Sequence, residues 1–365
     1  MMLSPRIIFL YLCMSKKRIL VAPLNWGLGH ATRCIPVINA LINENFEPVL
    51  ASDGAALELL KKEFPPLEWH QLPAYNITYS KNSSFFSFKL LLQVPHILKC
   101  IYREKKITAA LVKNHNLHGI ISDNRWGVRS QKLPSVFITH QLKVFSGITT
   151  PISTYIQQKF IRKFNECWVP DNKEFPNLSG SMGHVRNLPI KVRYLGVLSR
   201  LKKEFTPVLY DIAILLSGPE PQRGMLEAIL EKELVDTALR VLFIRGLIEE
   251  KSNWEVQGNI SRVNFLTAKD LQQALNRSEI VISRSGYTSI MDLAHLEKKA
   301  FFIPTPGQPE QLYLAKKLKT EGHAPFCAQQ DFKLNLLDVM PQYKELNSFG
   351  TNRSLRCVFA LFKGE

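Results

Sequence analysis

The chain has 365 residues, of which 45% are hydrophobic and 21% charged, so it is long enough for two packed domains and is neither a disordered chain nor a coiled coil. Lysine and arginine total 47 against 31 acidic residues, and the formal net charge of +16 predicts attraction to nucleotide phosphates, anionic lipid or nucleic acid. The basic residues are scattered and form no zinc-finger, RNP or helix-turn-helix signature, so we expect no nucleic-acid partner.

The first residues, MMLSPRIIFLYLCM, form an apolar run that is too short to span a bilayer and has no small-residue cleavage site. We interpret residues 1–15 as an N-terminal extension, with the natural start near Met14; the alternative is a membrane-touching anchor. The cysteines are dispersed without CxxC spacing, which is typical of a protein in the reducing cytosol. They are Cys13, Cys34, Cys100, Cys167, Cys327 and Cys357.

Short apolar runs alternate with amphipathic segments through the first half of the chain, which predicts a parallel sheet with helices on both faces. We assign this N-terminal domain to residues 16–205. The expected strands are 18–24, 47–52, 118–123 and 135–140, and the expected helices are 31–44 and 54–64. Region 144–205 lacks the alternation, so we expect it to hold the crossover, with CWVPD (167–171) as the last strand of the domain.

Segment 83–106 mixes phenylalanine and leucine with a basic tail. One interpretation is a surface that dips into a membrane interface beside anionic head groups. The other is a core helix that is interrupted at Pro95.

The alternation resumes in the second half, which we assign to a C-terminal domain at residues 206–346 followed by a C-terminal helix at 347–365. The expected strands are 211–217, 240–245, 262–266, 279–284 and 299–304, with a loop and helix over 218–234. The fold class is therefore α/β, with two Rossmann-like parallel-sheet domains that face a central cleft. Ligands of such sheets bind beyond the carboxyl ends of the strands.

A glycine-rich loop, NWGLGHATR, follows the first strand and leads into a helix. Gly27 and Gly29 let the backbone approach a ligand closely, and the helix N-terminus favours negative charge. The dinucleotide fingerprint is incomplete, because Thr32 stands at the third glycine position. His30 is placed to act as a general base or to donate to a sugar or phosphate; the alternative is an ordinary turn whose histidine caps the helix.

Three loops of the second half carry polar residues in comparable positions. In LLSGPEPQRGM, Ser217 and Gly218 offer backbone amides to a diphosphate and Arg223 adds a cation. In ISRSGYTSIMDLA, a tight turn of Arg284, Ser285 and Gly286 precedes a helix that carries Asp292, a candidate acceptor for ribose hydroxyls. In IPTPGQPEQLYLA, Gln308, Glu310 and Gln311 suit sugar hydroxyls. Plain turns and solvated polar residues are the alternatives at each loop.

These motifs together resemble the GT-B glycosyltransferases, nearest glycosyltransferase family 28, which includes the UDP-N-acetylglucosamine transferase of peptidoglycan synthesis. The glycine-rich loop with its histidine matches at Gly27, Gly29 and His30. The Arg-Ser-Gly turn, the following acid, a strand that ends in proline and a glutamine-rich helix start match at Arg284, Ser285, Gly286, Asp292, Pro304 and Gln311. Two features depart from the family pattern: Asp292 replaces a glutamate, and Ser217-Gly218-Pro219 replaces a Gly-Gly-Ser type of loop.

The resemblance implies an inverting glycosyltransferase that moves a sugar, such as an N-acetylhexosamine, from a UDP-sugar to a glycan or lipid-linked acceptor. The donor would bind near Ser217, Gly218, Arg223, Arg284–Gly286, Asp292, Gln308 and Gln311. The acceptor would bind near Gly27, Gly29, Asn124 and His140, with His30 as the base and Asp123 as the second candidate. We expect no cofactor and no metal, since the chain contains no Asp-x-Asp motif and amides with Arg284 or Arg223 can stabilise the leaving diphosphate.

Two further expectations follow. We expect the enzyme to be cytoplasmic. A further expectation is that it contacts the inner face of the plasma membrane peripherally. GLGHATR also resembles the sugar-nucleotide hydrolase of pseudaminic acid synthesis, so hydrolysis with water as the acceptor is the alternative function.

Overall fold

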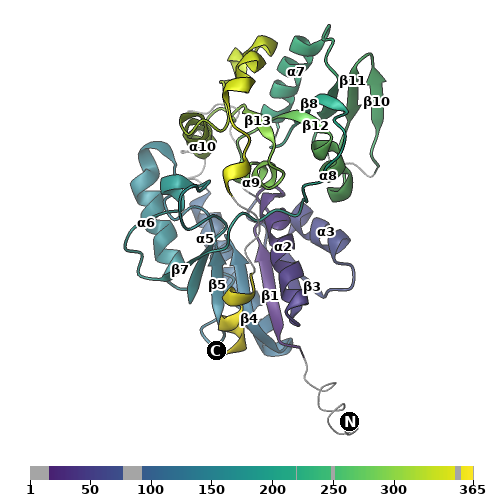
Figure 1. Ribbon diagram of the computed structural model, residues 1–365. Coiled ribbons are helices and arrows are strands. Elements are labelled where there is room, and N and C mark those ends of the chain that lie inside the picture. Colours follow the sequence, from purple (N-terminus) through teal and green to yellow (C-terminus); the bar gives the residue numbers. More distant parts are fainter. Residues whose placement is uncertain (1–15, 77–92, 219, 248–250, 350–354, 365) are drawn as a thin grey trace, which may run out of the picture.

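The computed structural model describes residues 16–76, 93–218, 220–247, 251–349 and 355–364. These residues form two α/β units, one on a seven-stranded sheet and one on a six-stranded sheet (Figure 1). The strand orders are β3-β2-β1-β4-β5-β6-β7 and β10-β11-β9-β8-β12-β13. Neighbouring strands are parallel within the described residues except for the antiparallel pair β10–β11. The expected pair of Rossmann-like units is thereby confirmed.

The N-terminal unit alternates strands and helices from its first strand to its last. Its strands are β1 (Arg18–Pro23), β2 (Glu47–Ser52), β3 (Trp69–Gln71), β4 (Leu117–Asp123), β5 (Ser135–Ile138), β6 (Glu166–Val169) and β7 (Lys191–Tyr194). Its helices are α2 (Gly29–Asn43), α3 (Gly54–Glu63), α5 (Val94–Asn114) and α6 (Thr150–Ile161).

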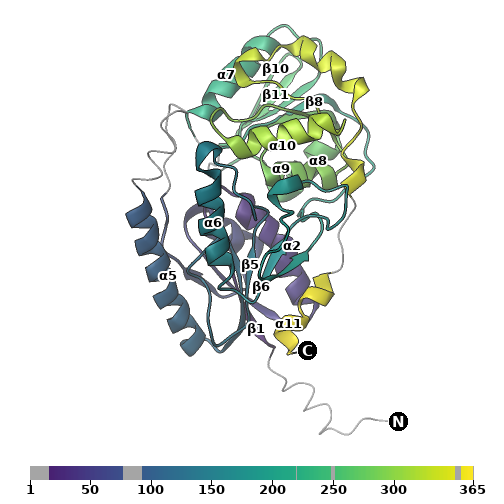
Figure 2. The ribbon, with the colours of Figure 1, turned by 90° about the vertical axis from the view of Figure 1, so that its left-hand side faces the viewer.

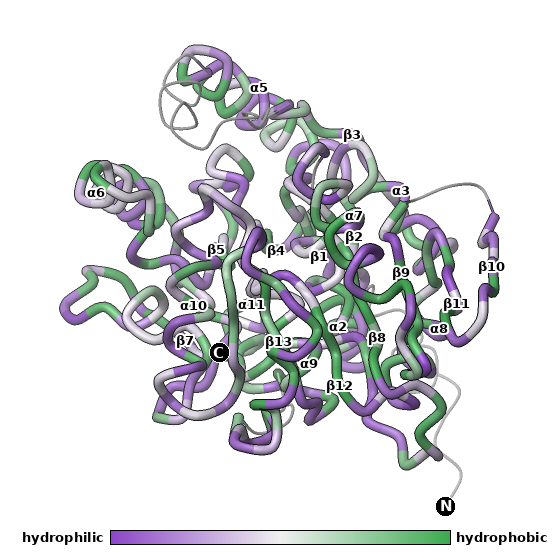
Figure 3. Tube along the Cα trace, turned by 90° about the horizontal axis from the view of Figure 1, so that it is seen from above, coloured by the Kyte–Doolittle hydropathy of each residue, from purple (hydrophilic) through white to green (hydrophobic). Residues whose placement is uncertain are grey.

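The C-terminal unit repeats this plan with a hairpin at one edge. Its strands are β8 (Tyr210–Leu215), β9 (Val241–Ile244), β10 (Trp254–Gln257), β11 (Ile260–Val263), β12 (Ser278–Ser283) and β13 (Lys299–Phe302). Its helices are α7 (Gln222–Leu234), α8 (Ala268–Asn276), α9 (Tyr287–His295) and α10 (Pro309–Thr320), followed by short 3₁₀ turns and α11 (Ala360–Lys363). Figure 3 shows the hydrophobic residues along β8, β12 and β13, where helices cover the sheet.

Helix α2 has a central place because both units bury it. Ile35, Ile38 and Leu41 recur at helical spacing and are buried, as the amphipathic pattern predicts. The first turn of α2 contacts α9 of the C-terminal unit, which lies directly above it in Figure 1. The chain finally returns to the N-terminal unit, where Phe362 of α11 packs edge-on against Phe46 and Trp168.

Region 144–205 corrects one expectation, because it contains regular structure. It holds α6, β6 and β7, so the strand predicted at 167–171 is β6 (Glu166–Val169) and is followed by one more strand. The strand expected at 262–266 lies earlier, as β11 (Ile260–Val263). Short or exposed strands leave no apolar run to recognise, which explains why β7 and β10 were missed.

Residues 1–15 and 77–92 lie outside the described part of the chain, so the extension and the first part of segment 83–106 are not described. The remainder of that segment begins α5, where Pro95 occupies the first turn and does not interrupt the helix. The helix is amphipathic: Cys100 and Ile101 are buried, whereas Leu98 and Tyr102 are more than half exposed. The described part of the segment thus packs one face against the core of the unit, whereas membrane contact of the other face stays a prediction. No helix among the described residues is both long and apolar enough to cross a bilayer.

Candidate active site

Both sheets reverse their strand order at a defined point, and the predicted site residues follow the strands at those points. The N-terminal sheet reverses between β1 and β4, where His30 follows β1 and Asp123 ends β4. The C-terminal sheet reverses between β8 and β12, where Ser217 and Arg284 follow the strands. Ligands of open parallel sheets bind at such switch points.

The two switch points lie on the facing ends of the units. Thr288, in the first turn of α9, donates from Oγ1 to the carbonyl of Gly29 at 3.3 Å. A side chain at position 29 would collide with Thr288, because a Cβ built there would lie 2.7 Å from its Oγ1. The lack of a side chain at Gly29 therefore permits contact between the two units.

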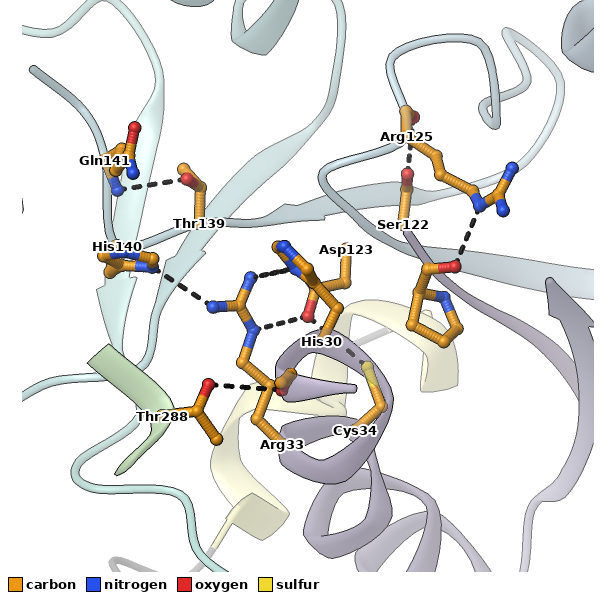
Figure 4. Close-up of polar contacts among 12 residues, drawn as sticks. His30, Arg33, Cys34, Ser122, Asp123, Arg125, Thr139, His140, Gln141 and Thr288 are labelled. Carbon is orange, nitrogen blue, oxygen red and sulfur yellow. Dashed lines mark hydrogen bonds and ion pairs between the residues drawn. The ribbon is translucent and has the colours of Figure 1, made fainter. Parts of the chain in front are cut away.

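His30 and Asp123 form a hydrogen-bonded pair at the N-terminal switch point (Figure 4). His30 Nδ1 lies 2.8 Å from Asp123 Oδ1, and the carboxylate is completely buried. The imidazole side chain is 15% exposed, so its position is accessible while its partner is not. This geometry fits a base whose ring is oriented by a carboxylate.

Arg33 completes this cluster, and the sequence-based prediction omitted it. Its Nε donates to Asp123 Oδ2 at 2.5 Å, and its Nη2 donates to Asp123 Oδ1. Nη2 also lies 2.8 Å from His30 Nδ1. Arg33 stands three residues after His30 in α2, which places both side chains on one face of the helix. This spacing within GLGHATR was the available signal.

The electrostatics of the cluster keep Asp123 ionised and His30 neutral at neutral pH. Burial alone would raise the pKa of Asp123, but the charges of Arg33 and His30 and their hydrogen bonds hold it well below its usual range. Burial lowers the pKa of His30 below its usual value of 6.5, and the positive charge of Arg33 lowers it further against the opposing effect of Asp123. A neutral imidazole can accept a proton.

His140 connects this cluster to the C-terminal unit. Arg33 Nη1 donates to His140 Nδ1 at 3.1 Å, so the ring proton resides on Nε2, which donates to Glu310 Oε1 at 2.8 Å. Gln141 donates to the other oxygen of Glu310. His140 also stacks on Tyr287 of α9, with the ring centroids 4.0 Å apart. The acceptor-side candidate His140 therefore lies at the contact between the units.

Two other acceptor-side candidates shape loops beside the pair. Gly27 has a positive φ of 75°, and no atom lies within 4 Å of the Cβ that would be built there. Asn124 follows Asp123 with a φ of 56°, and its backbone amide donates to Ile138. Both residues adopt left-handed backbone conformations that turn the chain at the carboxyl ends of β1 and β4.

The structure does not present Arg284, Ser285 or Arg223 to a ligand as predicted. Arg284 is buried, and its guanidinium donates to the carbonyls of Ile303, Pro304 and Gln222 and to the amide oxygen of Gln329. Ser285 is buried and donates to the Gln311 carbonyl. Arg223 pairs with Glu220 and Glu227. These side chains are directed inward because the loop carbonyls and helix carboxylates need buried partners.

The guanidinium of Arg284 is nevertheless a buried positive charge beside the turn, because all four of its hydrogen-bond acceptors are neutral. Burial lowers the pKa of Arg284 to about 10, so it remains protonated at neutral pH. Its Nε is buried and has no hydrogen-bond partner among the described residues.

Two glycines of the predicted donor loops, Gly218 and Gly286, have unoccupied space on the side where a side chain would stand. Gly218 is exposed, and a Cβ built there would meet no atom within 4 Å. Gly286 caps the N-terminus of α9, and its nearest neighbour would be Ser289 Oγ at 4.0 Å. Ser217, between β8 and Gly218, is half-buried. The N-terminus of the nine-residue helix α9 carries backbone amides that are suited to bind an anion, and Gly286 at this end places no side chain beside them.

Asp292 and the glutamines serve local contacts. Asp292 accepts a hydrogen bond from Ser199 Oγ at 2.6 Å, and burial raises its pKa to about 6. Gln311 accepts from the Thr305 amide at 2.8 Å and donates to Gln308 at 2.7 Å, so both amides hold the loop before α10 in place. Glu310, between them, is the residue of this loop that contacts the N-terminal unit.

Several known proteins with similar sequences or structures are glycosyltransferases. Residues 225–349 match the glycosyltransferase family 28 C-terminal domain, a range that contains Arg284–Gly286, Asp292 and Gln311. An uncharacterized glycosyltransferase of Methanopyrus kandleri is 22% identical over 315 residues, which cover 81% of this chain and 85% of the relative. The family that the motifs resemble is thus the family whose C-terminal domain matches residues 225–349.

Two further comparisons cover nearly the whole chain. The UDP-N-acetylglucosamine–N-acetylmuramyl-(pentapeptide) pyrophosphoryl-undecaprenol N-acetylglucosamine transferase of Haemophilus ducreyi is 23% identical over 344 residues, 90% of this chain and 89% of the relative. The crystal structure of Acinetobacter baumannii MurG superposes with a TM-score of 0.57 at 14% identity, covering 96% of this chain and all of that one. The GT-B fold is therefore established.

Proposed function

We propose that this chain, a GT-B glycosyltransferase similar to family 28, transfers an N-acetylhexosamine from a UDP-sugar to a hydroxyl group of a lipid-linked acceptor, with inversion and without a metal. One observation carries the proposal: the His30–Asp123 pair occupies the switch point of one sheet and faces the switch point of the other. The relatives that act on UDP-N-acetylglucosamine and an undecaprenol-linked acceptor supply the substrate class.

His30 is the base in this mechanism. We propose the tautomer in which Nδ1–H donates to Asp123, so that Nε2 takes the proton from the acceptor oxygen; in this tautomer Arg33 Nη2 donates to Asp123 Oδ1 and not to the ring. That oxygen attacks the anomeric carbon from the face opposite the nucleotide. The bond from this carbon to the diphosphate breaks, and UDP leaves with the electron pair. The products are the glycosylated acceptor, UDP and one proton, which His30 passes to solvent.

Arg33 keeps the pair ready for this step. Two hydrogen bonds fix the Asp123 carboxylate, and the nearby positive charge disfavours the imidazolium form of His30. The base therefore stays unprotonated at neutral pH. Arg33 acts through Asp123 and His30 and is a positioning residue.

The leaving diphosphate would be stabilised by backbone amides and by charge in the C-terminal unit. The open turn at Gly286 and the α9 N-terminus offer amides, and the buried cation of Arg284 raises the potential behind them. Ser217 and Gly218 would approach the diphosphate from the facing loop, and Asp292 would accept from the ribose. No divalent ion is required for these contacts.

A membrane-embedded acceptor needs an enzyme surface that reaches the bilayer, and we propose that α5 and α6 form it. Figure 2 shows both helices on one side of the N-terminal unit. Their exposed apolar residues are Val94, Leu98, Tyr102, Ile152, Tyr155 and Ile156. Exposed basic residues surround them at Lys99, Arg103, Lys106, Lys159 and Lys163. Apolar insertion combined with basic residues favours an anionic, cytoplasmic leaflet.

The direct test incubates the protein with radiolabelled UDP-N-acetylglucosamine in the presence and absence of polyprenyl-diphosphate-linked acceptors. We expect acceptor-dependent transfer of label to the lipid phase with stoichiometric release of UDP. Release of free sugar at the same rate without acceptor would instead establish the hydrolase function. A thermal-shift screen of nucleotide diphosphates identifies the donor class independently of the acceptor.

A further inference from the structure

A group of three side chains with metal-ligand chemistry lies at the end of the N-terminal sheet opposite His30. Glu68 precedes β3, His70 lies within β3, and His115 is the C-cap of α5. His115 precedes β4, and Asp123 ends it, so the two sites are separated by a strand length on the order of 20 Å. This group therefore takes no part in the proposed transfer reaction.

The ligand atoms of the three residues converge on one point. His70 Nε2 and His115 Nδ1 each lie 2.7 Å from Glu68 Oε1, and all three ligand atoms lie within 4.8 Å of one another. The two imidazole rings meet edge to face, with their centroids 4.4 Å apart. Two nitrogens and one carboxylate oxygen constitute a common protein ligand set of zinc sites that keep a fourth position for water.

Arg18 holds the carboxylate in the orientation that a metal ligand needs. Its guanidinium pairs with Glu68 Oε2, which leaves Oε1 directed at the two histidines. The same guanidinium donates to Glu47 Oε1 at 3.1 Å and to the His115 carbonyl at 2.6 Å. Arg18 is therefore shared between two carboxylates, those of Glu47 and Glu68. Hydrogen bonds of this kind to ligating carboxylates orient them and tune metal sites.

Tetrahedral geometry requires both ring nitrogens to move away from Glu68 and to lie about 3.3 Å from each other, starting from a separation of at most 4.8 Å. Zinc–nitrogen and zinc–oxygen bonds of about 2.0–2.1 Å place neighbouring ligand atoms about 3.3 Å apart, so each ring nitrogen must withdraw from Glu68 by about 0.6 Å. The three side chains are 21% to 36% exposed, which gives them room to move and lets an ion enter. A ring nitrogen that binds the ion carries no proton, so each imidazole would hold its proton on the nitrogen that faces away from the ion.

We propose that Glu68, His70 and His115 form a binding site for a divalent transition-metal ion of the zinc class, with water as the fourth ligand. The ion joins the C-terminal end of α5 to the edge strand β3. Because two imidazoles and one carboxylate are a common ligand set of zinc, Zn²⁺ is the appropriate probe and Co²⁺ its spectroscopic substitute.

The test titrates Co²⁺ into the untagged, chelator-treated protein and records the visible spectrum, which is intense for tetrahedral and weak for hydrated Co²⁺. We expect one tetrahedral equivalent that Zn²⁺ displaces, and His115→Gln to weaken Zn²⁺ binding by at least about tenfold. Glu68→Gln provides a second variant of unchanged size. The matched control is His96→Gln, which removes an exposed histidine from the same helix. Wild-type protein with no tetrahedral spectrum, or equal affinity in His115→Gln and His96→Gln, would overturn the proposal.

Discussion

His140 of the N-terminal unit donates from Nε2 to Glu310 of the C-terminal unit at 2.8 Å. His140 also accepts from Arg33, which in turn binds Asp123 beside His30. A continuous series of polar contacts therefore joins the first turn of α10 to the proposed base. Burial alone would raise the pKa of Glu310, but His140 and the nearby Arg33 lower it, so the contact carries charge at neutral pH. The position of one unit is thus linked electrostatically to the base in the other.

Replacing His30 with alanine should remove the base and leave nucleotide binding intact. The expected loss in kcat is roughly 10²- to 10⁴-fold, the usual contribution of general base catalysis. The loss is measured with saturating donor and acceptor, and calorimetry with UDP measures binding. His96→Ala removes an exposed histidine of α5 and serves as the control. Weakened UDP affinity with unchanged kcat would assign His30 to the donor site instead.

Replacing Arg33 with methionine should shift the pH dependence of activity. Activity requires neutral His30, so it declines as the pH falls through the His30 pKa, which lies below 6.5 in the native protein. Without the positive charge of Arg33 this pKa rises, and the acidic limb of kcat/KM moves to higher pH. The variant therefore loses more activity at pH 6 than at pH 8.

Arg33→Lys provides the control for this shift, because it keeps the charge and loses the paired hydrogen bonds to Asp123. Its acidic limb should stay near that of the native enzyme. Circular dichroism checks folding in both variants, since breaking a buried ion pair is destabilising. An acidic limb that is identical in Arg33→Met and the native enzyme would remove Arg33 from control of the base.

The core strands could be predicted from the sequence because their residues are buried on both faces of a covered sheet. Such strands appear as continuous apolar runs, as in 118–123 and 211–217. β3 and β10 are short, exposed edge strands whose letters, WHQ and WEVQ, carry no such signal. Edge pairing depends on which neighbour is available, and this information is not local to the segment.

The candidate site was predictable in its backbone positions and less so in its side chains. His30 was selected from the glycine-rich loop after the first strand and Asp123 as the second candidate for the base, and the structure places His30 Nδ1 2.8 Å from Asp123 Oδ1. Arg284 and Arg223 were assigned to phosphate binding because the sequence shows that a side chain is charged but not where it points. Their guanidinium groups reach several ångströms from the backbone, and buried carbonyls and carboxylates within that reach compete with any ligand. Whether the remaining donor residues bind nucleotide stays a prediction.

Replacing Gly286 with valine should weaken donor binding without destabilising the fold. Gly286 has extended backbone angles, φ −69° and ψ 139°, which a β-branched residue adopts readily. A Cβ there would meet only Ser289 Oγ, at 4.0 Å, so this first side-chain atom fits without a clash. If the amides of this turn bind the diphosphate, the added side chain would occupy the phosphate position and raise the KM for the UDP-sugar at least about tenfold, or roughly 1.4 kcal/mol. Gly286→Ala should have a smaller effect of the same sign, and unchanged UDP affinity in a folded Gly286→Val would place the diphosphate elsewhere.

Replacing Asp292 with asparagine should separate stability from binding. The folded-state pKa of Asp292, about 6, lies above the usual 3.8, so the unfolded chain ionises first as the pH rises. The free energy of unfolding contributed by this group therefore falls between about pH 4 and 6 and stays reduced above pH 6. The asparagine side chain carries no charge and can still accept from Ser199, so the melting temperature should rise at pH 7.5, by the equivalent of roughly 1–3 kcal/mol, and change little at pH 4.

The same variant should bind UDP more weakly at pH 7.5, because an amide oxygen accepts ribose hydroxyls less strongly than a carboxylate. The difference should diminish at pH 5, where native Asp292 is itself protonated. Calorimetry at the two pH values measures both affinities. A variant that is more stable but binds UDP with unchanged affinity would leave Asp292 as a buried acid outside the ribose site.

Membrane contact through α5 and α6 predicts a specific dependence on charge and on apolar surface. The native protein should sediment with vesicles of anionic phosphatidylglycerol, bind phosphatidylcholine vesicles weakly, and dissociate as salt is raised. A double variant, Leu98→Glu with Tyr155→Glu, places carboxylates on side chains that are 55% and 62% exposed, so folding is spared while insertion is opposed. Val256→Glu alters a still more exposed apolar residue, on β10 of the C-terminal unit, and should bind vesicles like the native protein. If the two variants sediment with vesicles to the same extent, the membrane contact lies outside α5 and α6. If only the double variant fails to sediment, its transfer to a lipid-linked acceptor should fall. Its transfer to a water-soluble analogue of that acceptor, assayed without detergent, should be retained.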